Sequence, residues 1–132
     1  MFVLDTNAVV HALKGLGRVR DMIARIHPSD LAIPAVVAYE LELGVLGSRN
    51  PAARRRDLML VLRTLPVLPF DSESASSAAR VRFELERAGE TIGPIDTLIA
   101  GTVLAQGPNA TLITHNSREF SRVQSLRIDD WF

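Results

Sequence analysis

Short apolar runs alternate along the chain with longer stretches in which apolar residues recur every three to four positions. The short runs predict buried strands and the longer stretches predict amphipathic helices. The expected strands are Phe2–Leu4, Leu31–Ile33, Val67–Phe70, Thr111–Thr114 and Leu126–Ile128. The expected helices are Ala8–Leu13, Arg18–Ile26, Val36–Leu46, Ala52–Leu65, Asp71–Ala88 and Pro94–Ala105. Because strands and helices alternate, we expect a single α/β domain over residues 1–132, with a mostly parallel sheet of four to five short strands and helices on both faces.

Prolines, an aspartate and a glycine mark the expected ends of several helices. Pro51 and Pro94 stand where helices begin, and proline is favoured at the first helical position. Asp71 is placed to cap the next helix, and Gly89 to end it. These residues fix the helix boundaries more sharply than the apolar pattern does.

Composition restricts the chemistry that the chain could perform. Lys+Arg and Asp+Glu both number 15, so the net charge is zero and the protein is not broadly basic. There is no cysteine, which excludes disulfides, thiol catalysis and thiolate metal sites. The three histidines lack zinc-motif spacing, so a metal would be held mostly by oxygen, which favours Mg²⁺ or Mn²⁺. No signal peptide or membrane-spanning run is visible, and we expect a cytoplasmic protein.

Two expected strands are followed directly by polar segments that contain acids. Asp5 follows the first strand, and Asn116 and Glu119 follow the fourth. The carboxyl ends of strands in an open parallel sheet face one crevice, where ligands bind. We therefore expect these three side chains at the same edge of the sheet.

Two of the acids also have a purely local explanation. Asp5 could cap the helix that begins near Ala8. Asp96 lies in the first turn of the helix opened by Pro94, where the helix dipole stabilises an acid by about 0.3–1 kcal/mol. However, the segment that follows Asp96 is otherwise apolar, which favours an inward-facing carboxylate.

Glu40 lies in the helix after the second strand, and its surroundings differ from those of Glu42. Two positions on a helix differ by about 200°, so the two side chains point to opposite faces. Glu40 shares its face with Val36, Val37, Leu43 and Gly44. We expect that face to be packed, with Gly44 allowing another element to approach closely. The alternative is that Glu40 forms a salt bridge with one of the arginines.

Separate segments thus deliver several carboxylates to one edge of the sheet. Mutual repulsion among them would destabilise the fold unless a cation compensates. Such clusters bind divalent metal, lower the pKa of a bound water and hold a phosphate for in-line attack. The pattern therefore favours Asp5 as a metal ligand over Asp5 as an isolated cap.

Four segments carry these acids: Val3–Asn7, Glu40–Gly44, Gly93–Gly101 and Thr114–Phe120. In this order and spacing they resemble a PIN domain, and specifically the VapC toxins of bacterial toxin–antitoxin pairs. The ending Leu126–Trp131 is also similar to the C-terminus of one VapC branch. The resemblance covers essentially the whole chain.

The resemblance implies a toxin that is a Mg²⁺- or Mn²⁺-dependent endoribonuclease, cleaving RNA phosphodiester bonds with a metal-activated water. It also implies a VapB-type antitoxin, a homodimer, a possible higher hetero-oligomer, and contact with DNA only through the antitoxin. Asp5 and Asp96 match the acids that hold the metal, and Glu40 matches the third acid. Many relatives carry an aspartate where this chain has Asn116, so either Asn116 or Glu119 fills the fourth position.

Other residues near these segments have open roles. Thr6 either hydrogen-bonds a carboxylate or caps the first helix, and the role of His115 is undetermined. Arginines on two helices offer phosphate contacts as a group, although each alone is better explained by a solvated face. They are Arg49, Arg54, Arg55, Arg56, Arg80, Arg82 and Arg87.

Two other functions remain as alternatives. An aspartyl-nucleophile phosphatase would use Asp5, but the acid expected two residues later is Asn7. A non-enzymatic PIN-like binding module is favoured only by Asn116, and the acids Asp5, Glu40 and Asp96 argue against it.

Overall fold

The computed structural model describes all 132 residues and contains a five-stranded, entirely parallel sheet. The strand order is β3-β2-β1-β4-β5. The strands are β1 (Phe2–Leu4), β2 (Leu31–Pro34), β3 (Val67–Leu68), β4 (Thr111–Ile113) and β5 (Arg127–Asp129). This confirms the predicted fold class. Strand β3 is shorter than predicted, and it ends before Pro69, which has no N–H to donate to a neighbouring strand.

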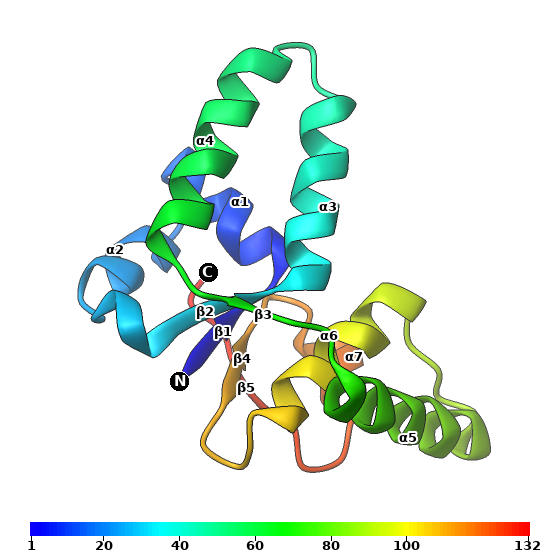
Figure 1. Ribbon diagram of the computed structural model, residues 1–132. Helices are drawn as coiled ribbons and strands as arrows, with labels where there is room; N and C mark the ends of the chain where they lie inside the picture. The colour runs from blue at the N-terminus through cyan, green and yellow to red at the C-terminus, as the bar shows by residue number, and fades with distance from the viewer.

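Seven α-helices surround the sheet, with α1 and α2 on one side and α5 and α6 on the other (Figure 1). The helices are α1 (Thr6–Lys14), α2 (Val19–Ala24), α3 (Ala35–Leu46), α4 (Pro51–Thr64), α5 (Ser72–Ala88), α6 (Pro94–Ala105) and α7 (Ser117–Phe120). The six longer ones were predicted to within a few residues. Helix α7 was not predicted, because four residues are too few for a helical period to show.

The predicted helix ends are confirmed where a cap was proposed. The Asp71 carboxylate accepts a hydrogen bond of 2.9 Å from the backbone N–H of Ser74. Gly89 ends α5 with a φ of 68°, a left-handed conformation that favours glycine. Pro51 and Pro94 are the first residues of α4 and α6. No helix combines the length and the apolar character needed to cross a lipid bilayer.

The central strands place two of the acid-bearing segments side by side. Leu4 in β1 pairs with Ile113 in β4, and the N–H of Asp5 donates to the Ile113 carbonyl at 3.1 Å. Asp5 therefore leaves the sheet next to the segment that follows β4. Helices α3 and α4 form a hairpin that rises from this carboxyl edge (Figure 1).

Helices α5 and α6 pack closely at Gly101, and this contact predicts a sensitive position. A Cβ atom added to Gly101 would lie 2.5 Å from Ala78 Cβ and 2.6 Å from Ala78 backbone atoms. Because backbone cannot yield cheaply, we expect Gly101→Ala to lower the free energy of unfolding by about 1–3 kcal/mol. Denaturant unfolding of the purified protein measures this change.

Gly44→Ala is the matched control, because a Cβ at that position has no neighbour within 4 Å. Alanine is the better helix former, so this variant should be neutral or slightly more stable. If Gly44→Ala and Gly101→Ala lowered the free energy of unfolding equally, the close contact between Gly101 and Ala78 would not be the cause of the destabilisation.

Candidate active site

Asp5 is both a helix cap and a member of the acidic cluster. Its Oδ1 accepts a 2.7 Å hydrogen bond from the N–H of Ala8, at the start of α1. Only 7% of the residue is exposed, and this burial raises the pKa of its carboxyl group. Hydrogen bonds from the Thr114 side chain and the Ala8 backbone act in the opposite direction, whereas the charge of Glu40 raises the pKa further. The two explanations considered for Asp5 are thus compatible.

Asp96 lies in the first turn of α6 and is half-buried. Burial raises the pKa of its carboxyl group to about 6, and repulsion from Glu119, Glu40 and Asp5 adds to the shift. The helix dipole, which would lower the pKa, does not prevail here. Carboxylates from four separate segments therefore lie close enough to repel one another.

Glu40 is held by a side chain from the first helix. The Thr6 hydroxyl donates to Glu40 Oε1 at 2.5 Å, which settles the two roles considered for Thr6 in favour of the carboxylate. The expected separation from Glu42 is confirmed, since Glu42 instead pairs with Arg55 at 2.5 Å. The salt bridge from Glu40 to an arginine, which was the alternative, does not occur.

The expectation of a packed face around Glu40 is wrong in part. Val36 and Val37 are buried, but Leu43 is 57% exposed. No element approaches Gly44, whose added Cβ would meet open space. Helix α3 projects beyond the sheet edge (Figure 1), and a groove rather than a close contact separates Gly44 from α1 and α4.

Asn116 and Glu119 contact each other at the start of α7. Asn116 Nδ2 donates to Glu119 Oε2 at 3.3 Å, and the Asn116 N–H donates to the Thr114 hydroxyl at 3.0 Å. Glu119 supplies the carboxylate that acts on Asp96. The two candidates for the fourth position are thus adjacent, with Asn116 orienting Glu119.

Thr114 is a site residue that the sequence analysis did not identify. It is fully buried directly after β4, and its side chain hydrogen-bonds the Asp5 carboxylate. A hydroxyl at the exit of an apolar strand next to the strand of Asp5 was the available signal. Its partner could not be read from the sequence because the contact joins residues far apart in the chain.

His115 contacts residues at the C-terminus and takes no part in the cluster of Asp5, Glu40, Asp96 and Glu119. Its Nδ1 lies 2.9 Å from Asp130 Oδ2, and its ring stacks on Phe132 with centroids 5.0 Å apart. The His11 ring of α1 packs edge-on against the same Phe132 ring, with ring centroids 4.4 Å apart. The C-terminal residue thus ties α1 to the segment that follows β4.

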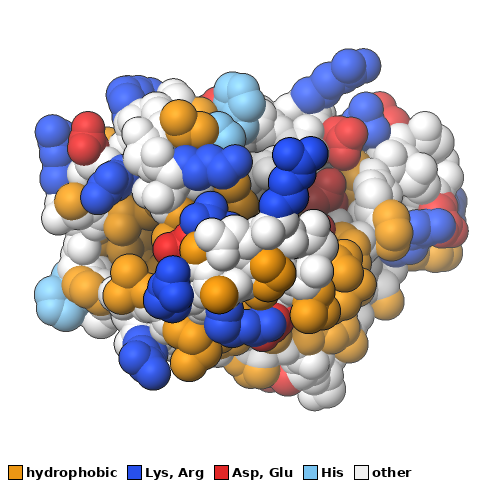
Figure 2. All heavy atoms as spheres, turned by 90° about the horizontal axis from the view of Figure 1, so that it is seen from above, with side chains coloured by type: hydrophobic (Ala, Val, Ile, Leu, Met, Phe, Trp, Pro, Cys, Tyr) orange, Lys and Arg blue, Asp and Glu red, His pale blue; other side chains and the backbone are white.

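No basic side chain neutralises the acidic cluster. Asp5, Glu40, Asp96 and Glu119 take part in none of the salt bridges, and Arg54, Arg55 and Arg82 pair with other acids. Figure 2 shows this end of the molecule, where Lys and Arg side chains are spread over the face and carboxyl groups are visible in a recess between them. As they stand, no three histidine, aspartate or glutamate side chains converge to hold one metal ion. The cluster nevertheless offers oxygen donors without a counter-ion, which suits a hard divalent cation.

Comparison with known proteins identifies the family to which this chain belongs. The PIN domain pattern matches residues 2–126. The chain is 32% identical to the tRNA(fMet)-specific endonuclease VapC of Salmonella typhimurium, covering 98% of this chain and 97% of that protein. It is 31% identical to ribonuclease VapC2 of Rickettsia felis, covering 99% and 98%. The DNA-bound VapBC structure from Salmonella typhimurium superposes with a TM-score of 0.92 at 31% identity, over 99% of this chain and 98% of that one. The chain belongs to the PIN domain family, and within that family to the VapC group.

Proposed function

We propose that this protein is the toxin of a VapBC-type toxin–antitoxin pair and acts as a Mg²⁺- or Mn²⁺-dependent endoribonuclease. The observation that carries the proposal is the uncompensated cluster of carboxylates from four segments, whose mutual repulsion adds to the burial that raises the pKa of Asp96 to about 6. A fold does not retain such repulsion without cost, and a bound cation would relieve it. The VapC relatives named as endonuclease and ribonuclease supply the reaction class.

The carboxylates of the cluster fit Mg²⁺, which does not require a complete preformed set of protein ligands. Mg²⁺ keeps several of its waters and is commonly held by one or two carboxylates together with substrate phosphates. Asp5 and Asp96 would provide those carboxylates, since both are at least half-buried and both have raised pKa values. The lack of three converged ligands is therefore compatible with this metal.

The remaining site residues would orient the reactants. When bound, the metal lowers the pKa of a water and offsets negative charge on the phosphate. Glu40, held by the hydrogen bond from the Thr6 hydroxyl, would orient the attacking water. Glu119 and Asn116 line the side near Asp96, where the carboxylate and the amide could each contact water or phosphate oxygen. Cleavage would form a bond from the water oxygen to phosphorus and break one phosphate ester bond. The water loses a proton and the leaving oxygen takes one up, so the two products end in a phosphate and in a hydroxyl group.

We also propose a VapB-type antitoxin as partner and a homodimer as the assembled form. The structures similar to this chain include VapBC complexes from Rickettsia felis and Salmonella typhimurium, both bound to DNA. Large apolar side chains stay exposed on the surface, including Leu46, Leu60 and Phe83. Such residues are available for burial against protein partners. Contact with DNA would be made by the antitoxin.

The two alternative functions gain no support from the site. Asp5 is buried and engaged by Ala8 and Thr114, so its carboxylate is poorly placed to attack a phosphate. Asn7 is exposed and adds no acid beside it. A binding module without catalysis would have no use for an uncompensated cluster of acids.

Thr6→Val should weaken the site without removing any proposed ligand. Valine keeps the shape of threonine and loses the hydroxyl that holds Glu40. Loss of such an orienting partner typically costs about 10–100-fold in metal affinity or activity. RNA cleavage rates and Mn²⁺ binding by calorimetry measure the effect, and Thr6→Ser should restore both. Wild-type values for Thr6→Val would show that the hydrogen bond to Glu40 is incidental.

Sequencing of RNA ends after induced expression tests the proposed function directly. Wild-type protein should create new RNA ends at defined positions, and Asp5→Asn should not. Circular dichroism of the purified variant checks that it is folded, since asparagine also serves as a helix cap. Equal sets of new ends from wild type and folded Asp5→Asn would contradict the assignment of this site.

A further inference from the structure

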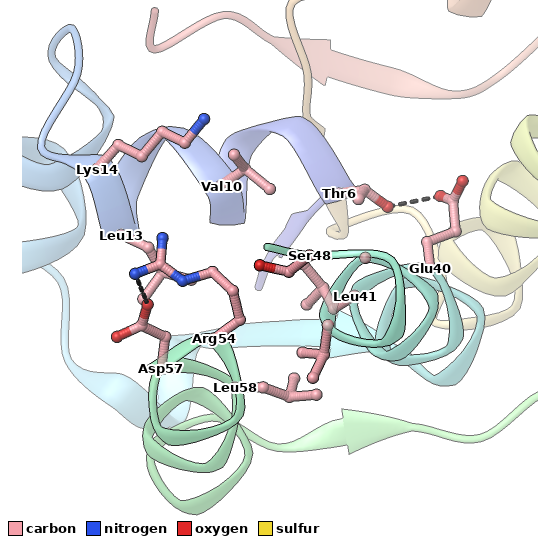
Figure 3. Close-up of a pocket in the computed structure, with 12 residues that line it drawn as sticks. Thr6, Val10, Leu13, Lys14, Glu40, Leu41, Ser48, Arg54, Asp57 and Leu58 are labelled. Atoms are coloured by element: carbon pink, nitrogen blue, oxygen red, sulfur yellow. Dashed lines mark hydrogen bonds and ion pairs between the residues drawn. The ribbon is translucent and has the colours of Figure 1, made fainter. Parts of the chain in front are cut away.

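A groove of about 480 Å³ lies between α1, α3 and α4 and opens beside the acidic cluster (Figure 3). Thr6 and Glu40 form one end of it, joined by their hydrogen bond. Lys14 and the Arg54–Asp57 ion pair, with a separation of 3.2 Å, form the other end. The groove therefore starts at a proposed catalytic residue and leads away from it.

The walls between these two ends are largely apolar. Val10 and Leu13 come from α1, Leu41 and Val45 from α3, and Leu58 from α4. Ser48 adds a hydroxyl, and no aromatic ring is present. A volume of this size lies within the range of about 300–1,000 Å³ typical of small-molecule pockets. The groove thus has room for one small molecule or one nucleotide, but not for an RNA duplex.

Gly44 keeps the groove open on the side of α3. It lies one turn beyond Glu40, and an added Cβ there would have no atom within 4 Å. Because Gly44 lines the groove, we expect a larger side chain there to reduce its volume. Gly44 can therefore be substituted without a clash at Cβ.

Charge at the rim favours an anionic occupant at the end remote from Glu40. Lys14 is exposed and takes part in no salt bridge, whereas Arg54 is held by Asp57. The free ammonium of Lys14 can pair with one phosphate of an RNA chain, and the neighbouring phosphate would then reach the acidic end, where the proposed metal would offset the repulsion. Bases removed from a stack are commonly held between apolar side chains, with polar groups at their edges.

We propose that this groove binds one unpaired nucleotide of the RNA substrate, immediately next to the phosphate that is cleaved. Its base lies between the apolar walls, Ser48 and the Arg54–Asp57 pair contact the base edge, and Lys14 contacts the adjoining phosphate. The proposal rests on the proposed ribonuclease function and adds to it a requirement for an unpaired nucleotide at the cleavage site. The groove then contributes to the choice of where RNA is cut.

Gly44→Leu tests the proposal by filling the groove. Binding is measured by fluorescence anisotropy with a labelled single-stranded RNA that spans a cleavage site mapped with the wild type. All variants carry Asp96→Asn so that the RNA stays intact. Loss of the apolar surface that one base buries in the groove should weaken binding by about 10-fold or more. Gly47→Leu is the matched control, because it adds the same side chain to the end of α3, outside the groove, without a close contact.

A second measurement asks whether the groove holds a base. RNA with an abasic residue beside the cleavage site should bind to the Gly44 and Gly44→Leu proteins with equal affinity. Mn²⁺ binding by calorimetry, in proteins that retain Asp96, should be the same for wild type and Gly44→Leu. That result would show that the acidic cluster is intact in the filled variant.

The outcomes distinguish failure of the groove proposal from failure of the proposed ribonuclease function. If wild type cleaves RNA but Gly44→Leu and Gly47→Leu bind RNA with equal affinity, only the groove proposal is overturned. Loss of antitoxin binding with unchanged RNA binding also overturns it, because the groove is then a protein site. A wild-type protein that cleaves no RNA overturns both proposals.

Discussion

Replacing Asp96 by asparagine should reduce metal-dependent RNA cleavage by about 100-fold or more while leaving the protein folded. Asparagine has nearly the same shape but removes one negative charge from the proposed metal site. Metal ions contribute several kcal/mol to catalysis of phosphate chemistry, and each 1.36 kcal/mol is a factor of ten in rate. The measurement is the cleavage rate of a labelled RNA at saturating Mg²⁺.

The fold should tolerate this change because Asp96 is an unfavourable charge in the metal-free protein. Its pKa is about 6 in the folded state and 3.8 without perturbation, so the folded protein binds more protons between these values. Metal-free stability must therefore fall as pH rises from about 4 to about 6. Asp96→Asn removes this fall, which is on the order of 1 kcal/mol once solvent screening of a half-exposed group is allowed for.

Asp21→Asn provides the control for a change of charge elsewhere on the surface. Asp21 is an exposed acid in the first turn of α2 and lies outside the cluster. This variant should cleave RNA at the wild-type rate. Full activity in folded Asp96→Asn would contradict the assignment of Asp96.

Lowering the pH below about 6 should weaken Mn²⁺ binding by up to about tenfold per pH unit. A proton on Asp96 must leave before the carboxylate can hold a metal, so protons and metal compete. Asp5, whose pKa is also raised, would add to the competition between protons and metal. Calorimetric titration of Mn²⁺ at pH 5, 6 and 7 measures the dependence.

The same titration on Asp96→Asn identifies the group responsible. Binding to the variant should be weaker at pH 7 and less dependent on pH between 5 and 7, because the titrating carboxyl group is gone. A Mn²⁺ affinity of the wild type that is constant over this range would show that the carboxyl group of Asp96 is not a metal ligand.

Much of the fold and of the acidic cluster could be predicted because both depend on local pattern and on one rule of topology. An apolar run followed by Asp5 marks a strand exit, and parallel neighbours bring the segment after β4 to the same edge. The helical period was enough to separate Glu40 from Glu42.

Features that depend on contacts between distant segments could not be predicted in the same way. The bond from Thr114 to Asp5 and the stacking of His115 on Phe132 join elements whose packing the sequence pattern does not specify. Gly44 was expected to be a close-packing site because helix periodicity does not reveal where a helix extends beyond the sheet. Gly101, on α6, is the glycine that has that packing role.

The arginines show a similar limit. Sequence position grouped Arg54 and Arg55 as possible phosphate contacts, but each is paired with an acid on α3 or α4. Lys14 did not stand out in the sequence, yet it is the free cation at the rim of the groove. The charges available to RNA depend on which ones the fold has already neutralised.

The most direct test of the account is the rate of RNA cleavage by purified wild-type protein during a Mn²⁺ titration that begins from chelator-treated, metal-free protein. The account predicts no cleavage without metal, a rate that rises to saturation with Mn²⁺, and a much lower rate for Asp96→Asn throughout. Cleavage at the full rate by the metal-free protein, or no cleavage at any Mn²⁺ concentration, would contradict it.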